Sequence, residues 1–184
     1  MARPAVFLDR DGTLIDDPGY LANPSDVRLL DGVADALRAL EHAGYIRVII
    51  TNQSGIGRGR FDVPTFHRVQ HAVDDALAAL GASVDGTYFC PHVPDAGCPC
   101  RKPGTALHRE AAAHFDIDLA ASWCIGDQPS DLEAAAAIGA RAMLVRTGEG
   151  ARHVNAAQVL GIPVAPDLEA AVAAILRSRT GVFP

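Results

Sequence analysis

The feature that most restricts the fold of this chain is an alternation of short apolar runs with longer amphipathic segments. The apolar runs, rich in β-branched residues, cover 5–8, 48–50, 84–89, 123–125 and 142–145. Segments with a helical period lie between and after them, at 32–43, 64–80, 104–115, 130–138 and 167–178. Strands that alternate with helices predict an α/β fold with a parallel sheet covered by helices on both faces. Beyond about residue 150 we expect one more short strand and a closing helix.

Length and charge narrow the class of protein further. The 184 residues, of which 49% are hydrophobic, suit one compact domain spanning residues 1–184. The net charge of −6 argues against nonspecific nucleic-acid binding, which needs a basic surface. No apolar run approaches the roughly 18 residues of a membrane span, and the N-terminal residues lack the layout of a signal peptide. We therefore expect a cytoplasmic protein, with a monomer as the default.

Polar side chains follow the predicted strands at their carboxyl ends. The first strand ends in "DRDG", which places Asp9 and Asp11 directly after it, and the second leads into Thr51 and Asn52. The fourth strand leads into "GDQPSD", which contains Asp127. Ligands of parallel α/β sheets bind beyond the carboxyl ends of the strands, so we expect these side chains to line one cleft.

Such a group of side chains suits a phosphoryl group. Asp9 and Asp11 would repel each other unless a cation neutralised them. Together with Asp127 they suit Mg²⁺, which keeps several waters and bridges phosphates. Thr51 offers a hydroxyl group, and Lys102, the only lysine beside fifteen arginines, offers an ammonium. Asp9 can then attack phosphorus to form an aspartyl-phosphate, and Asp11 can act as general acid and base.

Four short motifs carry a resemblance to a known superfamily. "DRDGTL", "TNQ", "RKPG" and "GDQPSD" occur in that order and resemble the motifs of the haloacid dehalogenase-like (HAD) phosphatases, over residues 5 to about 150. The resemblance implies a Rossmann-like, doubly wound sheet and a catalytic Mg²⁺. It also implies Asp9 as the nucleophile and a metal ligand, and Asp11 as the general acid/base. Alone, Asp11 followed by Gly12 would suit a simple turn, but the other motifs favour the catalytic interpretation.

The resemblance also assigns roles to the remaining residues of the site. Thr51 and Lys102 would hold the phosphate. Asp127 would bind the metal, with Asp11 contributing its backbone carbonyl, and Asp131 would support the metal shell. An alternative role for Asp131 is to cap the helix that begins there.

A second cluster of metal-type ligands lies between the third strand and the "RKPG" motif. Cys90, His92, Cys98 and Cys100 fall within eleven residues. Four such ligands with no open position suit a structural, tetrahedral Zn²⁺, and the prolines of this loop reduce the entropy lost on closing it. The alternatives are disulfides, which a cytosolic location disfavours, and a metal-free loop with an exposed histidine. Cys124 lies inside an apolar run and is interpreted as a core residue.

The cysteine loop narrows the resemblance to one subgroup. A zinc loop just before "RKP" and the stretch "TNQSGIGRG" resemble the D-glycero-D-manno-heptose 1,7-bisphosphate 7-phosphatases and the related histidinol-phosphate phosphatases. This resemblance implies hydrolysis of a sugar bisphosphate in lipopolysaccharide or related heptose synthesis. The segments between the motifs are too short for a separate cap domain, so we expect an open pocket. Many relatives carry a lysine where this chain has Gln128.

Arginines near the motifs are candidates for contacts with a second phosphate on the substrate. Arg58, Arg60 and Arg101 qualify because arginine binds phosphate in a bidentate manner. Arg101 is favoured because it adjoins Lys102. With Asn52, these residues would form the substrate site, and they favour a doubly phosphorylated sugar over histidinol phosphate.

Two further classes of protein are alternatives. A receiver-type signalling domain also combines clustered aspartates, Thr, Lys and Mg²⁺, but its acceptor aspartate ends the third strand, where this chain has Cys90. A 3′-phosphatase of nucleic-acid ends would suit an open pocket, but it does not suit a net charge of −6 without a basic stripe.

Overall fold

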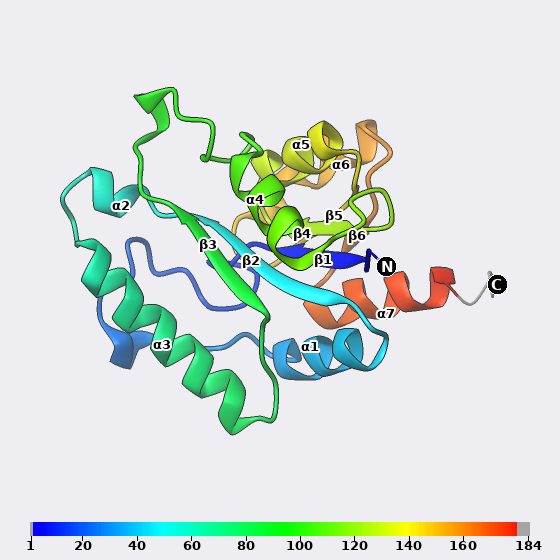
Figure 1. The fold of residues 1–184 in the computed structure, drawn as a ribbon, viewed down its shortest axis with the longest axis horizontal. Coiled ribbons are helices and arrows are strands. Elements are labelled where there is room, and N and C mark those ends of the chain that lie inside the picture. The colour runs from blue at the N-terminus through cyan, green and yellow to red at the C-terminus, as the bar shows by residue number, and fades with distance from the viewer. Residues whose placement is uncertain (1, 180–184) are drawn as a thin grey trace.

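A parallel sheet forms the centre of the fold. The computed structural model of the chain describes residues 2–179, in which helices flank this sheet on both sides (Figure 1). Within those residues the strand order is β3-β2-β1-β4-β5-β6, and every neighbouring pair is parallel. The strands are β1 (Ala5–Leu8), β2 (Ile46–Asn52), β3 (Gly86–Cys90), β4 (Trp123–Gly126), β5 (Arg141–Val145) and β6 (Val164–Ala165). The direction of winding reverses between β1 and β4, which creates a switch point at their carboxyl ends.

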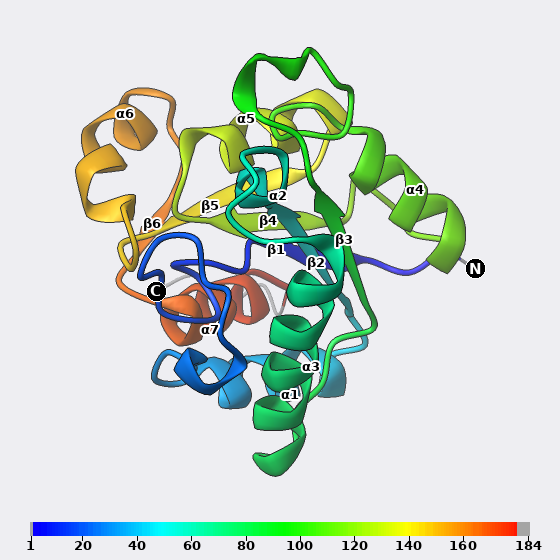
Figure 2. The ribbon, with the colours of Figure 1, turned by 90° about the vertical axis from the view of Figure 1, so that its left-hand side faces the viewer.

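Two layers of helices cover the sheet. On one face lie α1 (Val33–His42), α3 (Val63–Ala79) and α7 (Leu168–Arg179), and on the other α4 (Ala106–Phe115), α5 (Pro129–Ile138) and α6 (Val154–Val159). The short helix α2 (Ser54–Gly57) lies in front of the carboxyl ends of the strands (Figure 2). Three 3₁₀ turns complete the described elements, at Pro24–Asp26, Pro94–Ala96 and Gly150–His153. The site face is therefore built from loops and α2 rather than from the two helical layers.

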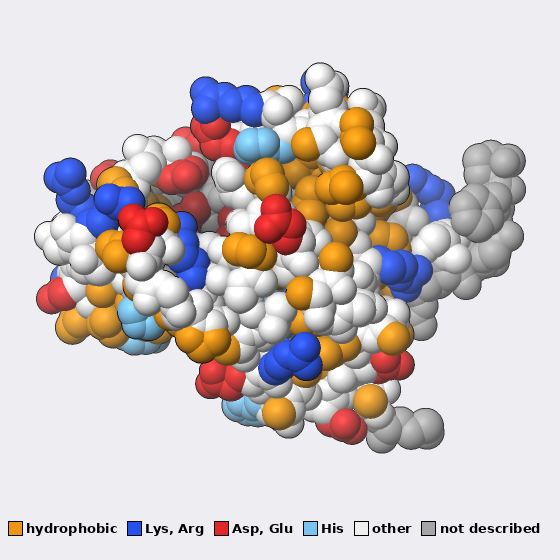
Figure 3. All heavy atoms as spheres, turned by 90° about the horizontal axis from the view of Figure 1, so that it is seen from above, with side chains coloured by type: hydrophobic (Ala, Val, Ile, Leu, Met, Phe, Trp, Pro, Cys, Tyr) orange, Lys and Arg blue, Asp and Glu red, His pale blue; other side chains and the backbone are white. Residues whose placement is uncertain are grey.

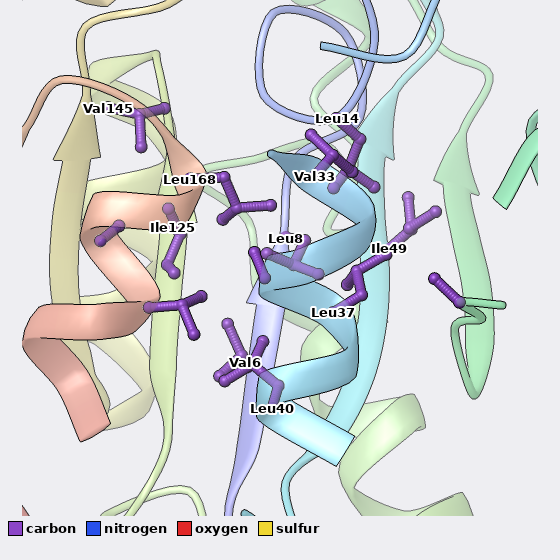
Figure 4. Packing of buried hydrophobic residues seen from close by; sticks show 14 of the residues in the cluster. Val6, Leu8, Leu14, Val33, Leu37, Leu40, Ile49, Ile125, Val145 and Leu168 are labelled. Carbon is purple, nitrogen blue, oxygen red and sulfur yellow. The ribbon is translucent and has the colours of Figure 1, made fainter. Parts of the chain in front are cut away.

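The core is divided by the sheet, because successive side chains of a strand point to opposite faces. Val6 and Leu8 of β1 face α1 and α7, where Leu37 and Leu168 pack against them (Figure 4). Phe7, between them in sequence, faces the α4 and α5 side. All four residues of β1 are buried, which is why this strand reads as one continuous apolar run. Each fully buried leucine contributes about 1.5–3 kcal/mol of transfer free energy, so β1 is firmly anchored beneath the site.

The predicted elements agree with the structure in type and order, and the differences lie at ends and in short pieces. Helix α4 begins at Ala106, after Thr105, rather than at Gly104. Helices α2 and α6, of four and six residues, were not expected, because so short a segment shows no helical period. Among residues 2–179, no helix is both long and apolar enough to cross a membrane.

Candidate active site

A cavity of about 330 Å³ opens at the carboxyl ends of β1, β2 and β4. Its walls include Gln128 and these predicted residues: Asp9, Asp11, Thr51, Asn52, Arg101, Lys102 and Asp127. Figure 3 shows acidic side chains inside a hollow on the left of the view, with Lys or Arg side chains on its rim. Arg58 is not among the residues of 2–179 that line this cavity, so the structure leaves it outside the group that the sequence predicted.

Lys102 lies at the centre of the buried charges. Its Nζ is 2.7 Å from Asp9 Oδ1 and 2.6 Å from Asp131 Oδ1, and it donates a hydrogen bond to the carbonyl oxygen of Ile50 at 2.6 Å. Its side chain is only 4% exposed. The three donors of the ammonium are therefore all used, which fixes the position of the charge.

The side-chain amide of Asn52 makes two hydrogen bonds to the backbone of Lys102. The Lys102 N–H donates to Asn52 Oδ1 at 3.0 Å, and Asn52 Nδ2 donates to the Lys102 carbonyl at 3.2 Å. The sequence placed Asn52 in the substrate site, and it does line the cavity. Its described hydrogen bonds, however, join the end of β2 to the loop that carries the lysine. No sequence signal indicated this clamp, since the two residues are fifty positions apart.

The buried carboxylates outnumber the ammonium beside them. Burial raises the pKa of Asp9 to about 8, even though Lys102 opposes the shift. Burial also raises the pKa of Asp127 to about 6, against the backbone N–H of Glu149. For Lys102, burial acts against the charged form, but the carboxylates of Asp131 and Asp9 outweigh it and raise the pKa. Three carboxylates beside one ammonium favour the entry of a further cation.

The oxygen atoms available in this cluster fit Mg²⁺. Asp9, Asp127 and Asp131 each offer an oxygen, and these atoms all lie within 4.8 Å of one another. Asp127 Oδ1 is buried and has no hydrogen-bond partner in the part of the chain that the structure describes. Asp127 Oδ2 accepts from the Glu149 N–H at 2.8 Å and from Gln128 Nε2 at 3.3 Å. An unpartnered carboxylate oxygen beside a second carboxylate is a donor set that a hard cation satisfies.

Asp131 combines the two roles that the sequence left open. Its Oδ2 accepts from the Gln128 N–H at 3.1 Å and so caps α5, while its Oδ1 pairs with Lys102. Both oxygens are therefore engaged, and Asp131 fits a supporting position better than a direct metal ligand.

Gly12 allows the backbone to lie directly against the Asp127 carboxylate. Its φ is +83°, and a Cβ at this position would lie 2.7 Å from Asp127 Oδ2. A larger residue would therefore meet both backbone strain and a clash with a predicted metal ligand.

Asp11 lies apart from the three clustered carboxylates. Its Oδ2 accepts from Gln53 Nε2 at 2.7 Å and lies 3.4 Å from Thr51 Oγ1, and Arg10 pairs with both of its oxygens. These contacts keep its carboxylate on the Thr51 side of the cavity, compatible with a backbone role toward the metal. Arg10 and Gln53 were not among the predicted site residues.

The cysteine loop brings its four predicted ligands together. Cys90 Sγ is 3.3 Å from Cys100 Sγ and 3.6 Å from Cys98 Sγ, and His92 Nδ1 is 3.2 Å from Cys100 Sγ. Ligands of a tetrahedral zinc lie roughly 3.5–3.8 Å apart, given its bond lengths. Burial opposes ionisation of Cys98, but the Arg101 N–H and the neighbouring thiols lower its pKa to about 6. All the cysteines are free thiols, and Cys124 is buried in β4 as expected. The loop therefore fits a zinc site.

The sheet order, with its acidic pair after β1 and its lysine paired with Asp9 and Asp131 at the switch point, is that of a haloacid dehalogenase-like hydrolase. Residues 99–171 match the sequence family described as HAD-hydrolase-like. The crystal structure of D,D-heptose 1,7-bisphosphate phosphatase from B. bronchiseptica, complexed with magnesium and phosphate, superposes with a TM-score of 0.87. It is 37% identical, and the match covers 95% of this chain and 99% of that one.

Curated sequences give the same result. The D-glycero-beta-D-manno-heptose-1,7-bisphosphate 7-phosphatase of Escherichia coli O6:H1 is 39% identical, over 95% of this chain and 90% of the relative. That of Photorhabdus laumondii is 45% identical, over 79% of this chain and 82% of the relative. This chain belongs to the heptose-bisphosphate 7-phosphatase family of HAD-like hydrolases.

Proposed function

We propose that the protein is a Mg²⁺-dependent phosphatase that removes the 7-phosphate of D-glycero-D-manno-heptose 1,7-bisphosphate. The observation that carries the proposal is the pairing of Asp9 with Lys102 beside the unpartnered oxygen of Asp127, at the switch point of the sheet. The curated relatives are named for the beta anomer. We propose the same anomer for this chain.

The side chains divide the reaction into two halves. An oxygen of Asp9 attacks phosphorus and forms an aspartyl-phosphate, while Asp11 gives its proton to the leaving sugar oxygen. Asp11 then takes a proton from water, whose oxygen attacks the same phosphorus, releases phosphate and restores Asp9. Thr51 would donate a hydrogen bond from its hydroxyl group to a phosphoryl oxygen, and the fixed positive charge of Lys102 would attract the phosphoryl oxygens. Bound Mg²⁺, held by Asp9, Asp127 and the backbone carbonyl of Asp11, would neutralise charge that develops on those oxygens.

The second phosphate of the substrate would contact Arg101. This arginine lines the cavity next to Lys102, whereas Arg58 does not line it and Arg60 lies over the ring of Tyr20 at 5.9 Å. A guanidinium at the wall of the cavity gives bidentate recognition of a phosphate. Arg101 is therefore the strongest of the three arginine candidates.

The loop of Cys90, His92, Cys98 and Cys100 would hold a structural Zn²⁺. The support is the mutual contact of four thiol and imidazole ligands, which leaves no position for substrate. We further propose that the chain acts as a cytoplasmic monomer, as a single domain without a separate cap, on a small-molecule sugar bisphosphate rather than on nucleic acid.

Phosphate release from a panel of esters tests the proposal. The panel contains both anomers of the heptose 1,7-bisphosphate and histidinol phosphate, each with Mg²⁺ and with Mg²⁺ chelated. We expect the fastest release from the beta heptose bisphosphate, and loss of turnover on chelation that added Mg²⁺ reverses. Faster cleavage of histidinol phosphate would reject the sugar substrate, and a stable phosphoprotein with no ester turnover would favour a receiver-type domain.

A further inference from the structure

Arg10 is a buried arginine that the reaction described above does not use. It lies between the nucleophile and the general acid/base in sequence, and only 1% of it is exposed. Its Nε lies 3.2 Å from Asp11 Oδ1, and its Nη2 lies 2.9 Å from Oδ1 and 3.0 Å from Oδ2. A guanidinium is costly to bury unless it is paired. The bidentate contact with Asp11 supplies this pairing, and only Nη1 of the guanidinium has no hydrogen-bond partner within residues 2–179.

The guanidinium of Arg10 is held by aromatic packing as well. Its carbon lies 5.3 Å from the centroid of the Phe66 ring of α3, and Phe66 in turn packs on Phe89 of β3 with centroids 4.1 Å apart. Arginine over an aromatic face gains a cation–π attraction. Arg10 is thus a rigid side chain set in the wall of the site, in contrast to a solvated surface arginine.

Asp11 is confined on its other side by Gln53. Gln53 Nε2 donates to Asp11 Oδ2 at 2.7 Å and also lies 2.8 Å from Thr51 Oγ1. Arg10 on one side and Gln53 on the other fix the plane of the carboxylate, with Oδ2 next to the hydroxyl predicted to hold the phosphate. An aspartate without these donors would be free to rotate about both side-chain torsions.

We propose that Arg10 is a positioning residue that, with Gln53, fixes the Asp11 carboxyl group in the orientation from which it exchanges protons with the reacting ester. This inference rests on the proposed phosphatase function. The carboxyl proton goes to the sugar oxygen as the bond between that oxygen and phosphorus breaks and the Asp9–phosphorus bond forms. The resulting Asp11 carboxylate, the form that Arg10 pairs with, takes a proton from the attacking water as the Asp9–phosphorus bond breaks. Arg10 itself gives up no proton.

The proposal makes the effect of Arg10 depend on the leaving group. A sugar oxygen leaves poorly unless it is protonated, whereas 4-nitrophenolate leaves readily without a proton. The kinetic constant kcat/KM covers the steps up to release of the leaving alcohol, so it isolates the half-reaction in which Asp11 is the acid. A residue that only maintains the fold would lower kcat/KM on both kinds of ester by the same factor.

The experiment measures kcat/KM of Arg10→Lys and Arg10→Met with Mg²⁺, on the heptose bisphosphate and on 4-nitrophenyl phosphate. Lysine keeps the charge but lacks the bidentate geometry. We expect a loss of about tenfold or more on the sugar phosphate and less than about threefold on the aryl phosphate, since general acid catalysis is worth on the order of 10²–10⁴. If the Arg10 variants do not fold, Phe66→Leu, which removes the ring beneath the guanidinium, should show the same selectivity at smaller amplitude.

Arg47→Met is the matched control. Arg47 is also buried, 5% exposed, and pairs with Asp85 at the opposite end of β2. Its loss should lower stability but leave the ratio of the two kcat/KM values unchanged. A second control places Arg10→Lys in an Asp11→Asn background, where it should add no further selectivity, because residues that act as a unit are not additive.

Three results would overturn the inference: equal losses on both esters, no loss on the sugar phosphate, or a full additional effect in the Asp11→Asn background. A wild-type protein that hydrolyses neither ester would instead reject the proposed function. The two failures are therefore distinguishable.

Discussion

Residues 2–179 hold two candidate metal sites that are built in opposite ways. The carboxylates of Asp9 and Asp127 are 118 positions apart in sequence and meet only because β1 and β4 are neighbours. The ligands of the cysteine loop, from Cys90 to Cys100, fall within eleven residues and lie together in one loop. The first site is buried, whereas in the second Cys90 is buried, Cys98 and Cys100 are half-buried and His92 is exposed.

The two sites also differ in the kind of ligand that they offer to a metal ion. The carboxylate site keeps an unpartnered oxygen, an excess of negative charge and an open cavity, which suit a hard cation and a substrate. In the cysteine loop, soft ligands contact one another and leave no open position. Loss of one site should therefore abolish turnover, and loss of the other should reduce stability.

The variant Asp9→Asn should give the largest effect. It removes the proposed nucleophile but keeps the shape of the side chain, so we expect turnover to fall by more than about a thousandfold. The metal-free protein should remain folded, because burial already disfavours the charged form of Asp9 and raises its pKa to about 8. Phosphate release and thermal unfolding measure the two effects. If the turnover of the variant stayed within about tenfold of wild type, the carboxylate site would not be the site of catalysis.

The variant Cys98→Ser should give an intermediate effect of the other kind. We expect zinc content to fall and the free energy of unfolding to drop by about 2–4 kcal/mol, with activity lost as a consequence. Metal analysis and urea unfolding measure this. Cys124→Ser is the matched control, since Cys124 is buried in β4 outside the loop and should leave zinc content unchanged. Zinc-free protein as stable and active as wild type would disprove the structural metal.

The variant His108→Phe should give the smallest effect and sharpens the contrast between two histidines. His92 is exposed among the proposed zinc ligands, whereas His108 is 2% exposed, edge-on to Phe7 at 5.1 Å. Burial, with the nearby charge of Lys102, lowers the pKa of His108 to about 3. The unfolded chain, with an ordinary histidine pKa of about 6.5, therefore binds more protons than the folded one below that pH, and stability is lost as pH falls toward 3.

Phenylalanine at this position removes that loss of stability. Between pH 6.5 and 5, the variant should lose about 1–2 kcal/mol less unfolding free energy than wild type, measured by urea unfolding at both pH values. His71→Phe, at an exposed position on α3, should leave the difference unchanged. An identical pH response in wild type and His108→Phe would show that His108 is protonated in the folded protein.

The fold and the composition of the site could largely be predicted from sequence because their signals are local. The apolar run 5–8 is the observed β1. Asp9 and Asp127 directly follow β1 and β4, Lys102 lies in the loop after β3, and all three line the cavity. The interaction partners could not be predicted. The Asn52 clamp on Lys102 joins residues distant in sequence, and the position of Arg58 outside the cavity depends on how the chain turns at α2.

By itself, then, the sequence determined the alternation of strands and helices, the acidic pair after the first strand and the ligand set of the cysteine loop. These are properties of period and spacing, which the local chain fixes. Only the tertiary structure decided that Asp131 both caps α5 and pairs with Lys102, and that the buried Arg10 pairs with Asp11. These contacts depend on which strands are neighbours in the sheet and on which charged side chains are buried together. Both are set by the packing of the whole chain.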